Sequence, residues 1–215
     1  MAKAGTRPTS TEHTWEELAV RWSATVEVVD ETATGHSGRV AEYAAALAER
    51  VGVPREELRW YRIGGLLHDV GKAAVPAAVL AKKGPLTPEE RLEVEKHAAA
   101  GAEMVASIDW PYDIRSMVLY HHERWDGRGY PHGLARSAIP LSARIMALAD
   151  VFDALTSERP YRPAYSPRQA MAIMLADRGS AFDPDLFDAF RELMSPKVYS
   201  KVPLRADDLP DRRAS

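Results

Sequence analysis

Apolar residues recur along the chain at helical spacing. Between residues 12 and 29 they stand three or four positions apart and form one stripe, the pattern of an amphipathic helix packed on a core. The stripe consists of Trp15, Leu18, Ala19, Trp22, Val26 and Val29. No convincing run of alternating apolar and polar residues is present, and Pro and Gly fall between the helical segments. The pattern therefore predicts an all-α protein of roughly eight helices.

Several helix starts are marked by capping residues. A second helix is predicted over residues 36–51, and Pro54 is typical of the first turn of a third. Two later helices should begin after Thr87 and Ser166. Each of these residues is followed by Pro and, at the third position, by a Glu or Gln that completes a capping box. Asp183, also followed by Pro, indicates one more start of the same kind.

The sequence divides the chain into three parts. Residues 1–11 are small and polar and are expected to form a flexible leader. Residues 12–195 are expected to form one domain, which includes the helix at 12–29, and residues 196–215 a polar tail. Within the domain, a long loop is predicted at 125–139, a segment dense in Gly and Pro.

Composition argues against several classes of protein. The chain has 215 residues, of which 46% are hydrophobic and 27% charged, as in an ordinary soluble globular domain. Its 28 Lys and Arg against 31 Asp and Glu give a net charge of −3, which argues against a dedicated nucleic-acid binder. The absence of cysteine excludes disulfides, thiolate zinc sites and cysteine nucleophiles. With no apolar run for a membrane span or signal peptide, a cytoplasmic protein is expected.

The placement of the seven histidines is the main chemical signal. His68 is followed directly by Asp69, and His121 and His122 are adjacent. The other candidates are His36, His97, Asp150 and Asp153. Imidazole and carboxylate ligands without sulfur favour Fe, Mn, Zn or Ni over Mg and Ca. A single buried histidine is more often a hydrogen-bonded core residue than a ligand, so the metal-site interpretation depends on the combination.

Five segments together resemble the HD-GYP phosphohydrolases, a branch of the HD superfamily that hydrolyses cyclic dinucleotides, chiefly cyclic di-GMP. The segments are His36, GLLHDVGK at 65–72, His97, HHERWDGRGYP at 121–131 and ALADVFDALTSERPYR at 147–162. The resemblance covers about residues 28–192, and the segments occur in the family's order. The HHExxDGxGYP stretch is highly specific, which makes a set of unrelated structural histidines a poor alternative.

The resemblance implies a site for two divalent metal ions. Four residues would form the basic HD site and three would hold the second metal, with the Asp69 carboxylate bridging both. The two sets are His36, His68, Asp69 and Asp150, and His97, His121 and His122. A shared carboxylate offsets the repulsion between two cations about 3.5–4 Å apart. Iron or manganese is expected before zinc or nickel. Some members hold a third metal through an acidic residue where this chain has Thr32, so two metals are expected here.

The resemblance also implies residues that contact or orient the substrate. Lys72, one turn after His68 and expected on the same helix, would contact a phosphate; the alternative is an ordinary surface lysine. Asp153 would orient either the attacking hydroxide or a ligand histidine. Arg159 and Arg162 offer forked donors for a phosphate or for the Hoogsteen edge of guanine.

The signature loop carries two further candidates. Gly129 would let the backbone approach a phosphate, and Tyr130 would offer its ring or hydroxyl to a base. A plain surface turn is the structural alternative, because Asp-Gly often marks one. The resemblance adds a third interpretation, in which the loop docks a diguanylate-cyclase-type protein partner.

The predicted activity is hydrolysis of cyclic di-GMP to linear pGpG through a metal-bridging hydroxide. The reaction either stops at pGpG or continues to GMP by a second cut, and the sequence leaves both open. One alternative is a phosphodiesterase for another cyclic dinucleotide such as cyclic GMP-AMP. Another is a catalytically silent module that senses the nucleotide or docks a partner, which the seven filled ligand positions disfavour. The stripe at 12–29 is expected to pack within the molecule; its alternative is the seam of a homodimer.

Overall fold

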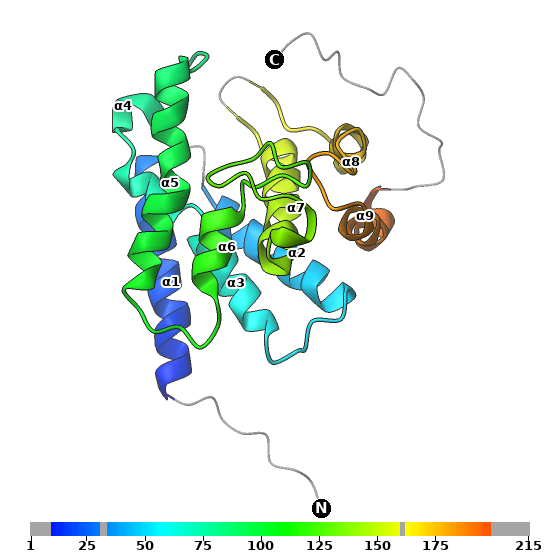
Figure 1. Cartoon of the computed structure of the whole chain (residues 1–215), viewed down its shortest axis with the longest axis horizontal. Helices are drawn as coiled ribbons and strands as arrows, with labels where there is room; N and C mark the ends of the chain where they lie inside the picture. Colours follow the sequence, from blue (N-terminus) through cyan, green and yellow to red (C-terminus); the bar gives the residue numbers. More distant parts are fainter. Residues whose placement is uncertain (1–9, 31–33, 160–161, 199–215) are drawn as a thin grey trace, which may run out of the picture.

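The computed structural model describes residues 10–30, 34–159 and 162–198, which consist of helices joined by loops (Figure 1). The α helices are α1 (Ser10–Val29), α2 (His36–Arg50), α3 (Leu58–Leu67), α4 (Ala77–Leu80), α5 (Pro88–Ala106), α6 (Ile114–Tyr120), α7 (Leu141–Thr156), α8 (Pro167–Leu175) and α9 (Pro184–Val198). Two 3₁₀ helices are η2 (Val70–Ala74) and η3 (Arg136–Ala138). Over the described ranges, pairing between extended segments is limited to isolated bridges. The all-α prediction is confirmed. The described ranges contain one α helix more than the roughly eight predicted, and the shortest of them is α4, a single turn.

The described ranges overlap the ends of the predicted domain. Helix α1 begins at Ser10, inside the predicted leader, and α9 ends at Val198, inside the predicted tail. The remaining parts of the leader and the tail, residues 1–9 and 199–215, lie outside the described residues. Among the helices that the structure describes, none combines the length and apolar character that crossing a bilayer requires.

Capping residues set several helix boundaries. Thr87 accepts a hydrogen bond from the Glu90 N–H at 3.2 Å, and the Glu90 carboxylate accepts one from the Thr87 N–H at 2.7 Å, which begins α5. Ser166 heads a second capping box at α8. The helix predicted from Pro54 begins later, at Leu58, because a hydrogen bond to the Pro54 carbonyl first closes a tight turn.

Helices α2, α3 and α7 form the centre of the fold. Figure 1 shows α1, α4 and α5 along one side of this centre and α8 and α9 along the other. Tyr43 of α2 packs edge-on against Phe152 of α7 at 5.2 Å between ring centroids, and Phe152 against Phe190 of α9 at 5.3 Å. This apolar centre fixes the relative positions of the helices that carry the candidate ligands.

Two glycines on either side of the His-Asp pair allow close approach of neighbouring backbones. A Cβ on Gly65 would lie 2.4 Å from the Cα of Ala41 in α2. A Cβ on Gly71 would lie 2.0 Å from the His97 carbonyl oxygen and 2.4 Å from the Gly101 nitrogen, both in α5. The first contact brings α3 against α2 and the second brings η2 against α5, so the His-Asp pair between them faces both helices.

Candidate metal centre

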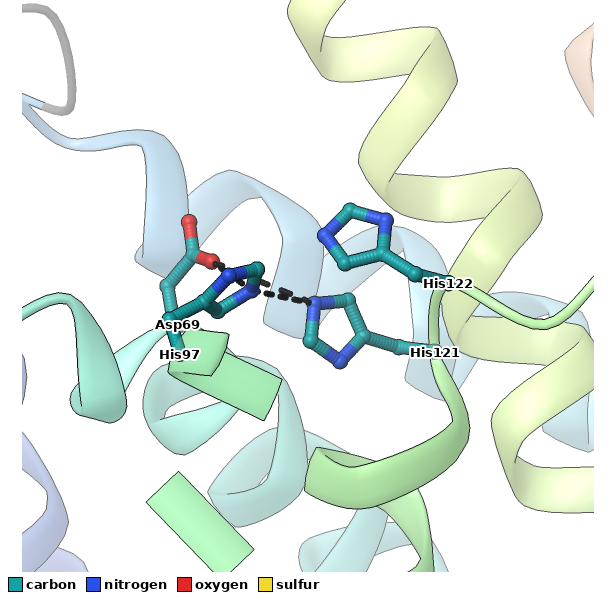
Figure 2. A group of neighbouring side chains, drawn as sticks. All are labelled: Asp69, His97, His121 and His122. Carbon is teal, nitrogen blue, oxygen red and sulfur yellow. Dashed lines mark hydrogen bonds and ion pairs between the residues drawn. The ribbon is translucent and has the colours of Figure 1, made fainter. Parts of the chain in front are cut away.

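The predicted ligands gather where α2, α3, α5, α6 and α7 meet. Six of the seven, all but Asp150, form two groups, and within each group one ligand atom per residue lies within 4.8 Å of all the others. The groups are Asp69, His97, His121 and His122, and His36, His68 and Asp69. Figure 2 shows the first group, with Asp69 and His97 on one side and the two adjacent histidines on the other. Asp69 is the residue that belongs to both groups.

Helix ends position most of these side chains. His36 is the first residue of α2, His68 follows the last residue of α3, and Asp69 precedes η2. His121 follows the last residue of α6, while His97 lies on the buried face of α5. The local signals that begin and end these helices therefore also place the ligands.

The two oxygens of Asp69 face different histidines. Its Oδ2 lies 3.4 Å from His68 Nε2 and 3.9 Å from His36 Nε2. Its Oδ1 lies 3.3 Å from His97 Nε2 and 3.9 Å from His121 Nε2. One carboxylate thus divides its oxygens between the two groups, which is the arrangement of a bridging ligand.

Backbone carbonyls orient three of the rings. In His68, His97 and His121, Nδ1 lies 2.8, 2.6 and 2.7 Å from the carbonyl oxygen three residues earlier. A carbonyl can only accept, so Nδ1 donates and the Nε2 of a neutral ring carries a lone pair. All three lone pairs are thereby available to the centre of the site, as metal-ligating histidines require.

These lone pairs face one another without a proton between them, which favours a bound cation. His97 Nε2 and His121 Nε2 lie 3.3 Å apart, although neither carries a proton for the other when both rings are neutral. His68 Nε2 is buried and has no hydrogen-bond partner among the described residues. A buried polar atom without a partner is costly, and a cation shared by such atoms removes that cost. The donor set therefore fits divalent transition metals.

Electrostatics keep Asp69, Asp150 and His122 in metal-binding charge states. Burial would raise the pKa of Asp69, but the positive charge of Lys72 is the largest of the opposing effects, which together hold that pKa well below its usual range. Burial would likewise raise the pKa of Asp150, and hydrogen bonding and charge from its neighbouring histidines lower it instead. Burial lowers the pKa of His122 to about 4. At neutral pH the site thus offers carboxylates and a neutral imidazole, which are the ligating forms.

The HD-domain family matches residues 23–186 of the chain. The chain belongs to this family. It is 41% identical over 175 residues to the cyclic di-GMP phosphodiesterase response regulator RpfG of Xanthomonas campestris pv. campestris, a match to 80% of this chain and 46% of that protein. It is 38% identical over 175 residues to 3'3'-cGAMP-specific phosphodiesterase 3 of Vibrio cholerae, a match to 80% of this chain and 38% of that one. The chain thus spans less than half the length of these curated relatives.

A solved structure supports the fold of this HD-domain protein. The crystal structure of a cyclic GMP-AMP specific phosphodiesterase of V. cholerae superposes with a TM-score of 0.65 at 19% sequence identity, over 93% of this chain and 55% of that chain. At this identity the likeness shows the fold alone. Together with the family match and the relatives, it confirms the resemblance to HD-GYP proteins.

Lys72 of the HD domain lies beside the Asp69 carboxylate. Its Nζ is 2.8 Å from Asp69 Oδ2 and 3.1 Å from Asp30 Oδ2. The expectation that Lys72 continues the helix of His68 was wrong, because α3 ends at Leu67 and Lys72 belongs to the tighter η2. Asp30, which follows α1 and was expected to point elsewhere, also reaches the site through Lys72. Thr32 lies outside the described residues.

Asp153 orients a histidine through a network that the sequence analysis missed. Its Oδ2 lies 2.7 Å from His36 Nδ1, which favours the ligand-positioning alternative. The Asp153 carboxylate is held by Arg39, whose Nε and Nη2 donate to its two oxygens at 2.7 and 3.0 Å. Arg39 also donates to the Ser157 hydroxyl at 2.9 Å. On the other ring nitrogen, His36 Nε2 lies 3.2 Å from Asp150 Oδ1.

Replacing Arg39 should weaken metal binding without removing a ligand. We expect Arg39→Ala to lower affinity for one metal about 10–100-fold, the usual effect of losing a group that orients a ligand. Arg39→Lys should recover only part of this loss, because an ammonium cannot donate two fixed hydrogen bonds to Asp153. Metal titration of chelator-treated protein measures the effect. Arg62→Ala, which removes an exposed pairing with Glu42, is the control; unchanged affinity in Arg39→Ala would contradict the assignment.

The metal-free protein should lose stability as His36 deprotonates. Burial alone lowers the pKa of His36, but hydrogen bonds to Asp150 and Asp153 outweigh burial and raise it from 6.5 to about 9. Because the folded pKa exceeds the unfolded value, this stabilisation is complete below pH 6.5 and disappears as the pH rises through about 9. Urea unfolding in chelator measures the decline. His36→Gln should flatten it, and an equal decline in both proteins would refute the prediction.

The signature loop folds back onto the histidines. A Cβ on Gly129 would lie 2.5 Å from the His122 carbonyl oxygen and 2.4 Å from the Arg124 nitrogen, so glycine is required by packing within the protein. The Tyr130 ring stacks on the His122 ring, with centroids 4.7 Å apart. Glu123, which the sequence analysis did not single out, is buried and accepts the His132 N–H at 2.8 Å.

The two candidate arginines lie beyond the end of α7. Arg159 and Arg162 pair through their backbones, each N–H donating to the other's carbonyl at 2.9 and 3.0 Å. The Arg162 guanidinium donates to carbonyls at the end of α7 and lies over Tyr165, 4.1 Å from the ring centroid. Arg162 thus caps the helix, and a substrate contact by either arginine stays a prediction.

Proposed function

We propose that this HD domain hydrolyses cyclic di-GMP to linear pGpG. The observation that carries the proposal is the division of the two Asp69 oxygens between two groups of histidines. A relative that is 41% identical is named a cyclic di-GMP phosphodiesterase, and its match covers 80% of this chain. The filled ligand set favours an active enzyme over a silent sensing module.

We propose that this site binds two metal ions, Fe or Mn before Zn or Ni. When bound, these ions would activate a water nucleophile and withdraw negative charge from the phosphate. His36, His68, Asp69 and Asp150 would hold one ion, and Asp69, His97, His121 and His122 the other. Asp153 keeps the His36 ring in the orientation that directs Nε2 to the site.

Lys72 would act on the substrate phosphate. Burial lowers the pKa of Lys72, but the charges of Asp69 and Asp30 outweigh burial and raise it above its usual value, so the ammonium stays protonated. Its position 2.8 Å from the bridging carboxylate places a fixed cation beside the site of reaction. A cation there stabilises the negative charge that grows on the phosphate as water attacks and the 3′ oxygen leaves.

Cyclic GMP-AMP is the second candidate substrate. A relative that is 38% identical is named a 3'3'-cGAMP-specific phosphodiesterase, which supports this alternative. Both cyclic dinucleotides present the same kind of phosphodiester to the metal site, so the choice depends on contacts with the bases. A diguanylate-cyclase-type partner at the signature loop, a homodimer through residues 12–29 and a cytoplasmic location stay predictions.

Product chromatography tests the proposed function. The chelator-treated protein is reloaded with Mn²⁺, or with Fe²⁺ under anaerobic conditions, and given each cyclic dinucleotide separately. We expect pGpG from cyclic di-GMP, and no product before reloading. His68→Ala should abolish turnover, whereas His132→Ala, which removes an exposed histidine outside the ligand groups, should not. Faster cleavage of cyclic GMP-AMP would select the second candidate, and no cleavage of either would contradict a cyclic-dinucleotide phosphodiesterase.

A further inference from the structure

His122 differs from the other proposed histidine ligands in how its ring is oriented. His68, His97 and His121 each direct Nδ1 to a backbone carbonyl, and His36 directs Nδ1 to Asp153. Among the described residues, no hydrogen bond is made by the ring of His122. A ligand ring without such a bond needs another contact to hold its orientation.

Tyr130 supplies that contact. Its ring stacks on His122 with centroids 4.7 Å apart and an angle of 29° between the ring planes. The other neighbours of His122 meet it at steeper angles, 43° for His121 and 83° for His97. A stacked neighbour resists rotation of the imidazole out of its plane, as the hydrogen bonds do for the other four rings.

The signature loop holds Tyr130 in place from its own backbone. The Tyr130 N–H donates to the His122 carbonyl at 3.3 Å, so the residue that carries the stacking ring is also tied to the backbone of the ligand. Gly129 allows the loop to approach the backbone this closely, because a Cβ at that position would lie only 2.5 Å from the Glu123 Cα. Two residues after Tyr130, the His132 N–H donates to the Glu123 carboxylate at 2.8 Å. The loop thus closes around His122 and Glu123.

We propose that Tyr130 is a positioning residue for the metal ligand His122, and that the fold of the signature loop thereby sets the affinity of the second metal. The inference rests on the proposed two-metal site. The proposed role of Tyr130 needs its flat ring and not its hydroxyl. This role is therefore distinct from one in which the Tyr130 hydroxyl contacts the substrate. Anything that lifts the loop would weaken the metal held by His97, His121 and His122 and leave the other in place.

Metal titration of chelator-treated Tyr130→Leu and Tyr130→Phe tests the proposal. Tyr130→Leu should bind one Mn²⁺ as the wild type does and the second about tenfold or more weakly. Tyr130→Phe keeps the ring and should bind both normally. Wild-type binding of both ions by Tyr130→Leu would overturn the proposal, as would an equal loss in the two variants. Uptake of a single ion by the wild type would instead contradict the two-metal function itself.

A double-variant cycle separates positioning from general loss of structure. If Tyr130 acts through His122, adding Tyr130→Leu to His122→Gln should cause no further loss of metal affinity. If the leucine variant merely unfolds the loop or the domain, it should weaken binding further in that background. An additional loss of tenfold would therefore contradict the proposal even if Tyr130→Leu is poorly folded.

Discussion

Asp69→Asn is expected to lower the rate of cyclic di-GMP hydrolysis by at least about 10³-fold. Metal ions contribute several kcal/mol of transition-state stabilisation, and each 1.4 kcal/mol corresponds to about tenfold in rate. Asp69 is the residue whose two oxygens face both histidine groups. An amide of the same shape lacks the charge that offsets two neighbouring cations. The variant should therefore bind both metals more weakly, whereas loss of an unshared ligand should affect mainly one.

The measurement is product formation together with the metal content of the same sample. Asp109→Asn, at an exposed aspartate between α5 and α6, makes the same chemical change and should behave as the wild type. Circular dichroism of the metal-free proteins checks that both remain helical. If Asp69→Asn kept two metals and wild-type turnover, Asp69 would not be the bridging ligand.

Gly71→Ala is expected to destabilise the protein by more than about 3 kcal/mol, or to prevent folding, through overpacking against backbone. The added Cβ would lie 2.0 Å from the His97 carbonyl oxygen and 2.4 Å from the Gly101 nitrogen. Neither atom belongs to a side chain that could turn away. Relief requires η2 and α5 to separate, which would also draw Asp69 away from His97.

Gly38→Ala is the matched control for this effect. Gly38 lies in α2, and a Cβ added there meets nothing within 4 Å. Alanine should stabilise this exposed helical position by about 0.5–1 kcal/mol. Urea unfolding of the two variants in chelator gives the free energies of unfolding. Equal stabilities for the two variants would show that the approach of η2 to α5 is not as close as described.

The features that the sequence predicted correctly are those with local causes. The capping box at Thr87 predicts the start of α5 because its two hydrogen bonds join residues three apart. The candidate ligands were named as a set from the resemblance of five segments to a known family, and the structure brings all of them except Asp150 into two close groups. Their role as ligands stays a prediction. The structure adds what no spacing shows, which is that Asp69 turns one oxygen to each group.

The features that the sequence did not predict depend on contacts between distant segments. Arg39 and Asp153 are 114 residues apart, and Asp30 and Lys72 are 42 apart, so neither pair leaves a periodic signal. The end of α3 before Lys72 was missed because the close approach of Gly71 to α5 is tertiary. The hydrogen bonds from the Arg162 guanidinium to carbonyls at the end of α7 were also not predicted, because they join residues seven and eight positions apart across a loop.

Turnover of cyclic di-GMP measured against added metal tests the central claim most directly. The claim is that two histidine groups sharing Asp69 form one two-metal hydrolytic site. Chelator-treated protein should show no turnover, and addition of Mn²⁺ should raise turnover to its maximum at two equivalents per chain. Full turnover without metal, or a maximum at one equivalent, would contradict the claim.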